Sequence, residues 1–213
     1  MKQVRKGKIE PVQSVAKPRL AESPLSEADL ARSVGARLKD LRIHSGLTLE
    51  DLSKRSGVSR AMLSKVERAE KSPTLAVFLR IAKGMNVSFS TLMGGKISKA
   101  KVVKIRAAHR LTFKDPETGF ERHNLSPAHP HGNVELLLHR IPPGQSSGIL
   151  PSYDTPTEKY LVVQTGTLRV IIGKKAYELN AGDSFYFNVE EPYRFDNPGG
   201  TECSYYLTIV KRA

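Results

Sequence analysis

Lysine and arginine side chains are concentrated in the first half of this 213-residue chain, where their chemistry is the recognition of anions. The formal net charge is +13 at pH 7. Residues 1–100 hold 20 Lys and Arg against 9 Asp and Glu, whereas residues 101–213 hold 14 against 12. The first half therefore has a balance of +11 and the second a balance of +2. This asymmetry predicts that the first half contacts a polyanion.

The single cysteine, Cys203, limits the covalent chemistry that is open to the chain. One thiol excludes an internal disulfide and any zinc site that needs two thiolates. The sequence near Cys203 offers no evident base that could activate the thiol as a nucleophile. We therefore interpret Cys203 as a small buried apolar residue. No stretch approaches the ~18 apolar residues that span a bilayer. We therefore expect a cytoplasmic protein with no membrane partner.

The elements that position the basic half have the period of helices, over residues 26–93. Apolar residues first recur on one helix face, at Leu30, Val34, Leu38 and Leu41. Gly46 and Gly57 fall where helices should end, and Thr48 and Ser59 can cap the helices that follow. The pattern predicts five helices, which begin near Ser26, Thr48, Ser59, Thr74 and Ser88.

After Val102 the pattern changes to short β-rich segments separated by turn signals, typical of an antiparallel sandwich or barrel. The expected strands are Val134–His139, Tyr160–Val163, Thr167–Ile172, Lys175–Leu179, Ser184–Phe187 and Ser204–Val210. The predicted organisation is a flexible basic tail (1–25), a helical domain (26–94), a linker (95–104) and a β domain (105–213).

Two short helices joined by a turn that contains Gly57 form a helix-turn-helix arrangement. The segment RIHSGLTLEDLSKRSGVSRAMLSKVER, residues 42–68, closely resembles the Cro/C1 (phage-repressor, or XRE) helix-turn-helix family. The resemblance extends over about 65 residues, from Asp29 to Met93. It implies a DNA-binding domain whose third helix lies in the major groove.

The same resemblance implies roles for particular side chains. The base-reading positions are Arg60, Ala61, Met62 and Lys65. The phosphate-contacting positions are Thr48, Ser59, Ser64 and Lys71. The Arg60 guanidinium can bond guanine O6 and N7 together, whereas Ala61 and Met62 offer only apolar contact. Purely solvated side chains are the alternative for Arg60, Ser64 and Lys71.

Other family positions are structural. Arg42 and Glu67 match an ion pair that ties the first helix to the third. Leu49 occupies a place often held by a phosphate-bonding glutamine. Ala69 stands where a glycine is usual, and we expect a slightly different turn there.

The strand region resembles the cupin family, a small antiparallel, jelly-roll-like β-barrel. The resemblance is carried by residues 142–144, 158–168, 182–187 and 192–199, within about 100 residues. The expected fold class is therefore multi-domain α + β, with a five-helix helix-turn-helix domain followed by a cupin barrel.

Many cupins hold a metal through histidines and a glutamate. Aligned on Gly166 and Pro192, the four ligand positions here are Tyr153, Thr155, Lys159 and Tyr193. These are not a standard ligand set for a transition metal, so no metal, cofactor or catalytic residue is predicted.

A second group of histidines has the spacing of a cupin metal site but lies at the wrong place in the chain. His129, His131 and Glu135 have the H-x-H-x3-E spacing of a cupin metal site. They precede Pro142, however, and lack both the following glycine and a late histidine partner. We interpret the two histidines as solvent-exposed loop residues.

The four former ligand positions, Tyr153, Thr155, Lys159 and Tyr193, are then expected to line a barrel mouth. A lysine among hydroxyl groups favours a small anionic effector. The alternative is that these side chains fill the barrel and bind nothing.

The resemblance favours a transcription regulator, as a homodimer on a palindromic double-stranded DNA operator. Repression is favoured, because occupying a promoter needs no further contacts. One alternative is a metal-dependent cupin enzyme resembling hydroxypropylphosphonate epoxidase, which the absent ligands disfavour. Another is a nonspecific nucleic-acid binder, which the side chains of the third helix disfavour.

Overall fold

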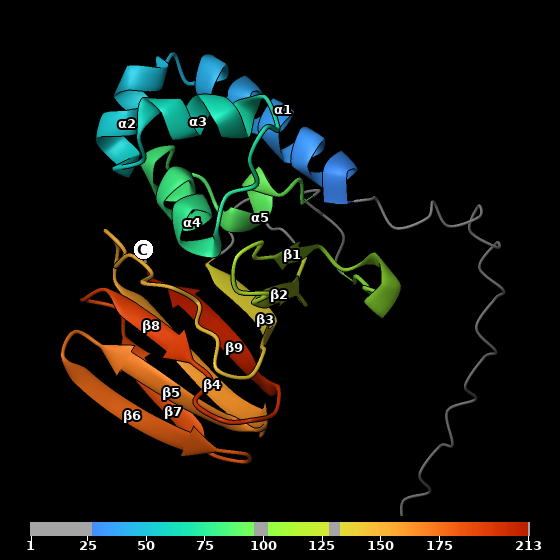
Figure 1. Cartoon of the computed structure of the whole chain (residues 1–213), viewed down its shortest axis with the longest axis vertical. Helices are drawn as coiled ribbons and strands as arrows, with labels where there is room; N and C mark the ends of the chain where they lie inside the picture. Colours follow the sequence, from blue (N-terminus) through green and yellow to red (C-terminus); the bar gives the residue numbers. More distant parts are fainter. Residues whose placement is uncertain (1–26, 96–101, 128–132, 213) are drawn as a thin grey trace, which may run out of the picture.

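The computed structural model describes residues 27–95, 102–127 and 133–212 (Figure 1). The expected basic tail (1–25) lies outside these residues, as do His129, His131 and residues 96–101 of the expected linker. No helix of the described residues is long and apolar enough to cross a membrane.

Five helices form the N-terminal domain, as the sequence pattern predicts. They are α1 (Glu27–His44), α2 (Leu49–Ser56), α3 (Arg60–Glu67), α4 (Leu75–Gly84) and α5 (Phe89–Leu92). Thr48 and Asp51 form a reciprocal capping box at the start of α2, and Gly57 ends that helix with φ +65°. Gly35 lets α1 approach α3 closely, because a Cβ there would lie 2.5 Å from the Val66 carbonyl oxygen.

The turn after α3 differs from the expectation for Ala69. Instead of a different turn, the chain keeps the left-handed one, and Ala69 adopts φ +56°. Its N–H donates to the Val66 carbonyl at 3.0 Å. An alanine in this region is less stable than a glycine by about 1 kcal/mol.

The β domain consists of two antiparallel sheets. The strands are β1 (Thr112–Lys114), β2 (Glu121–Asn124), β3 (Val134–Ile141), β4 (Thr157–Thr165), β5 (Thr167–Ile172), β6 (Lys175–Asn180), β7 (Ser184–Asn188), β8 (Tyr193–Asp196) and β9 (Cys203–Lys211). One sheet has the order β1-β2-β3-β9-β4-β7 and the other β6-β5-β8. A short 3-10 turn, Ala107–His109, precedes β1. The expected strands are present, several of them longer, whereas β1, β2 and β8 were not predicted.

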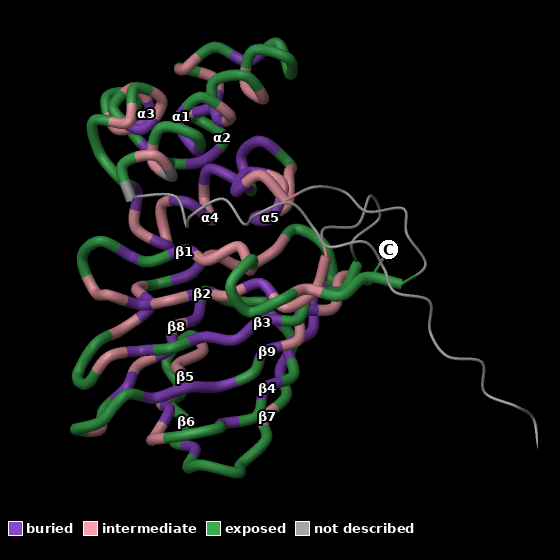
Figure 2. Tube along the Cα trace, turned by 90° about the vertical axis from the view of Figure 1, so that its right-hand side faces the viewer, coloured by how far each residue is buried: buried purple, intermediate pink, exposed green. Residues whose placement is uncertain are grey.

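The two sheets pack face to face, and most of the inward-facing side chains are buried, although β6 is largely exposed (Figure 2). Phe195 of the smaller sheet contacts Tyr205 of the larger one, with ring centroids 5.2 Å apart. Cys203 is buried in this core, as a small apolar residue would be.

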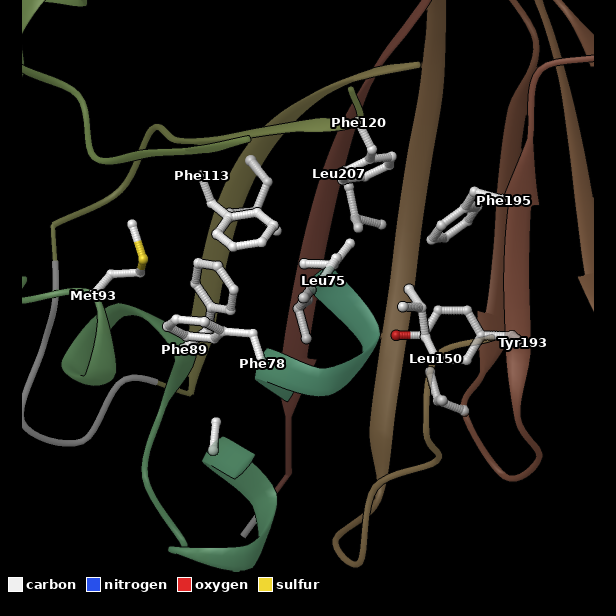
Figure 3. Close-up of a cluster of buried hydrophobic side chains, with 14 of the residues drawn as sticks. Leu75, Phe78, Phe89, Met93, Phe113, Phe120, Leu150, Tyr193, Phe195 and Leu207 are labelled. Atoms are coloured by element: carbon white, nitrogen blue, oxygen red, sulfur yellow. The ribbon is translucent and has the colours of Figure 1, made fainter. Parts of the chain in front are cut away.

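A continuous apolar core joins the two domains (Figure 3). Phe78 of α4, Phe89 of α5 and Phe113 of β1 have ring centroids 4.6 to 5.7 Å apart. At the start of α4, the Leu75 N–H donates to Asp115 Oδ2 at 2.7 Å. The helical domain therefore rests directly on the first strands of the β domain.

Candidate functional site

Helix α3 presents a polar face to solvent and an apolar face to the core. Leu63 and Val66 are buried, which fixes the rotation of the helix. Arg60, Ala61 and Lys65 are exposed as a result. Three of the four predicted base-reading side chains therefore project from one surface, while Met62 is half-buried against the core.

A shallow groove runs between the α1–α2 turn and α3. It is lined by Arg42, Ile43, Gly46, Leu47, Thr48, Leu49, Glu50, Arg60, Ala61, Ser64, Lys65 and Arg68. The structure thus brings two predicted phosphate residues, Thr48 and Ser64, beside the base-reading ones. Lys71 lies apart from this group, because it lines a different hollow between α1 and β1.

The predicted phosphate hydroxyls already have partners within the protein. Thr48 Oγ1 donates to Asp51 Oδ2 at 2.6 Å, and this bond lowers the pKa of Asp51. Ser59 Oγ accepts the Met62 N–H at 3.3 Å as the α3 cap. Ser64 Oγ accepts from Arg68, an exposed cation that the sequence reasoning missed although it lies one turn after Ser64.

Arg42 and Glu67 form the ion pair that the family resemblance implies. Arg42 Nε and Nη2 donate to the two carboxylate oxygens of Glu67 at 2.6 and 2.9 Å. Arg42 Nη1 donates to the Leu47 carbonyl at 2.9 Å. The hydrogen bond to Glu67 raises the pKa of Arg42. One guanidinium therefore joins α1, α3 and the turn between α1 and α2.

Lys159, at the former glutamate position of the cupin motif, is buried within the β domain. Its Nζ donates to Tyr193 Oη and lies 4.0 Å from the Tyr193 ring centroid. The Tyr153 and Phe195 rings are 5.6 and 5.7 Å away. No carboxylate of the described residues forms an ion pair with it, and burial lowers its pKa well below the usual range.

A pocket of about 310 Å³ lies between the helical domain and the β domain. Tyr153 and Thr155 line it, whereas Lys159 and Tyr193 lie outside its lining. The structure therefore divides the four predicted effector residues between a pair that lines the pocket and a pair buried away from it. Loss of solvent around its phenol raises the pKa of Tyr153 to about 12.

Glu135, the glutamate of the H-x-H-x3-E motif, also lines this pocket. Its Oε2 accepts from Arg122 Nη2 of β2 at 2.6 Å, and both residues are buried. Within the parts of the chain that the structure describes, no group of three or more His, Cys, Asp or Glu side chains could hold a metal.

Comparison with known proteins gives matches to two families and to two transcriptional regulators. The helix-turn-helix family matches residues 38–92, and the cupin domain family matches residues 137–210. The HTH-type transcriptional regulator SutR of Escherichia coli is 30% identical over 191 residues, covering 85% of this chain and 96% of that protein. An uncharacterized HTH-type transcriptional regulator of Sinorhizobium fredii is 35% identical over 65 residues, covering 30% of this chain and 84% of its own length.

A solved structure supports the same fold over almost the whole chain. The crystal structure of an HTH_3 family transcriptional regulator from Vibrio cholerae matches with a TM-score of 0.73 at 21% identity. The match covers 88% of this chain and 100% of that one. With the residue-level resemblance of α2 and α3, these matches assign this chain to the XRE-type helix-turn-helix transcriptional regulators with a C-terminal cupin domain.

Proposed function

We propose that this regulator is a sequence-specific repressor that binds a palindromic operator as a homodimer and senses a small anionic ligand through its β domain. The observation that carries the proposal is the exposed surface of α3, where Arg60, Ala61 and Lys65 stand beside a groove. A guanidinium and an ammonium on a rigid helix suit guanine edges, and Ala61 suits a thymine methyl group.

An apolar outer face on the six-stranded sheet supports dimerisation. Outward-facing positions of an antiparallel sheet exposed to water are normally polar. Here five such positions on β3, β4, β7 and β9 are large, apolar or aromatic, and 39 to 47% exposed: Leu136, Tyr160, Val162, Tyr186 and Tyr206. A contiguous patch of this kind is typical of a protein–protein interface. A two-fold dimer through this face would present two α3 helices to two half-sites.

The proposed function is tested by selecting duplexes from a random DNA library with the purified protein at near-physiological salt. We expect enrichment of a palindrome with equal half-sites about one helical turn apart. Binding without enrichment would overturn sequence specificity and leave a nonspecific DNA-binding protein. Placing the selected operator over a promoter then separates repression from activation in a transcription assay.

Base reading is tested by Arg60→Ala on the selected operator and on single-base variants of it. We expect a loss of about 1–3 kcal/mol in binding and relaxed discrimination at one base pair. Arg32→Ala is the matched control, because Arg32 is an exposed α1 arginine paired with Asp29. An equal loss for Arg60→Ala on every sequence would assign Arg60 to phosphate contact instead.

The dimer face is tested by Tyr206→Glu, measured by sedimentation. Tyr206 is 41% exposed on the proposed face, and Ile149, 66% exposed in the connection before β4, is the control. We expect Tyr206→Glu to sediment as a monomer and Ile149→Glu as a dimer. A dimeric Tyr206→Glu protein would place the interface elsewhere.

A further inference from the structure

The pocket between the domains is built from both of them. Its helical wall includes Leu79, Lys83 and Phe89 of α4 and α5. Its other wall includes the β3–β4 connection, with Tyr153, and the end of β9, with Lys211. A pocket of about 310 Å³ at a domain junction has the size and location typical of a small-molecule site.

The charged side chains that line this pocket include a cation that forms no ion pair within the described residues. The lining cations are Lys83, Arg122, Lys211 and Arg212, and the lining anions are Glu135 and Asp154. Arg212 is occupied by Glu158, at 2.7 Å. Lys211 forms no ion pair with a carboxylate of the described residues, and its Nζ lies 5.7 Å from the Tyr153 ring centroid.

Arg122 is a buried cation in the wall of this pocket. Only 4% of the residue is exposed, and its Nε has no hydrogen-bond partner in the described structure. Its Nη2 is held by Glu135, and its Cζ lies 4.2 Å from the centroid of the Phe89 ring. The guanidinium is therefore fixed in orientation, with its Nε enclosed by protein, and it adds positive charge to the pocket wall rather than an accessible Nε–H donor.

We propose that this pocket binds a small organic acid, whose carboxylate pairs with the Lys211 ammonium beside the fixed Arg122 guanidinium. The apolar part of the acid would lie against Leu79 and Phe89. This inference rests on the ligand sensing in the proposed function and specifies its site and ligand class. The anion binds in the interdomain pocket, and buried Lys159, which is outside the pocket lining, does not contact it.

Contacts of Lys83 at the same pocket link ligand binding to the helical domain. Lys83 of α4 donates to the Ser152 carbonyl at 3.1 Å and pairs with Asp154 Oδ1 at 2.8 Å. An acid in the pocket competes with Asp154 for Lys83 and releases the β3–β4 connection from α4. The two α3 helices of a dimer are then held less firmly at their spacing, so the acid lowers operator affinity.

Acid binding is measured by calorimetry with acetate, succinate, 2-oxoglutarate and citrate, with succinamide as the uncharged control. We expect at least one acid to bind more tightly than about 1 mM and succinamide not to bind. Lys211→Gln should weaken that acid at least about tenfold. Lys174→Gln, at an exposed turn lysine, should leave acid affinity unchanged. Failure of all four acids, or equal binding to both variants, would overturn the proposal.

The readout is measured as operator affinity with and without the binding acid, at matched ionic strength. We expect the acid to lower the operator affinity of the native protein. Asp154 is 78% exposed in its side chain, so Asp154→Asn should fold normally. This variant should still bind the acid but lose its effect on DNA. A full response in Asp154→Asn would overturn the Lys83 connection. Operator binding without any acid tests the proposed function separately.

Discussion

The two domains use charged side chains in opposite ways. In the helical domain the cations of α3 are exposed, and the half-buried Arg42 has a partner for each of its three nitrogens. In the β domain Arg122 and Lys159 are buried, and each has fewer partners than it can use. Exposed cations suit an extended polyanion, which stays hydrated at its outer side. Buried ones lie out of reach of a polyanion and are held by single partners within the protein.

Removing the glutamate of the Arg122–Glu135 pair, or that of the Arg42–Glu67 pair, should have the largest effect on stability. The difference between the two losses distinguishes the two domains most clearly. Glu135→Ala leaves Arg122 buried with no carboxylate, so we expect a loss of about 3–5 kcal/mol in the free energy of unfolding. Glu67→Ala should cost about 1–3 kcal/mol, because Arg42 keeps the Leu47 carbonyl and is nearer to water. Urea unfolding measures both. An equal or larger cost for Glu67→Ala would contradict the contrast.

Replacing buried Lys159 tests whether its burial lowers the stability of the folded protein. Burial lowers the pKa of Lys159, so the unfolded chain takes up a proton that the folded one does not. Stability from this group therefore rises with pH up to the unfolded pKa. We expect Lys159→Met to stabilise the protein at pH 7 by about 1–4 kcal/mol. The gain should shrink as the pH approaches 10.

Urea unfolding at pH 7 and pH 9 measures this difference. Lys174→Met is the control, because Lys174 lies in an exposed turn and its replacement should change little at either pH. A less stable Lys159→Met protein at pH 7 would mean that the surrounding rings hold a charged lysine.

The turn after α3 offers a smaller test within the helical domain. Ala69 has φ +56°, a conformation that glycine adopts without strain. Ala69→Gly should therefore raise the free energy of unfolding by about 1 kcal/mol. Ala36→Gly, at an exposed position inside α1, should lower it by about the same amount. Thermal unfolding of the two variants should shift in opposite directions, and a shift in the same direction would contradict the strain at Ala69.

Local signals explain why the helical domain was predictable from sequence. Thr48 and Ser59 cap helices and Gly57 ends one, and each acts within a few residues along the chain. The exposed face of α3 follows from the buried positions of Leu63 and Val66. The left-handed Ala69 was not predictable, because a glycine is the usual sign of that conformation.

The interdomain pocket depended on contacts that leave no local signal. Strand β2 reads Glu-Arg-His-Asn and has no apolar run, and it forms because β3 pairs with it in the sheet. The pairing brings Arg122 to Glu135, and the shared core brings α4 to the β3–β4 connection. Lys83 and Asp154 are 71 positions apart, so their ion pair could not be read from spacing.

The smallest expected effect concerns Glu50, a carboxylate that lines the groove of the helical domain. Glu50 lies 3.9 Å from Arg60 and 3.8 Å from Lys54, and all three side chains are largely exposed. Exposed pairs of this kind are weak, and a carboxylate there repels phosphates. Glu50→Gln should therefore raise operator affinity about two- to fivefold, and less at high salt. Glu178→Gln, on the outer β hairpin, should have no effect on DNA binding.

A fall in affinity for Glu50→Gln would change the interpretation of the helical domain. It would mean that Glu50 orients the Arg60 guanidinium toward the base edge, and that this orientation outweighs the repulsion of phosphates. The two domains would then share one device, a glutamate that fixes the orientation of an arginine, as Glu135 fixes Arg122. Discrimination at the Arg60 base pair decides between the two cases. It falls with Glu50→Gln if Glu50 positions Arg60, and stays constant if Glu50 only repels the backbone.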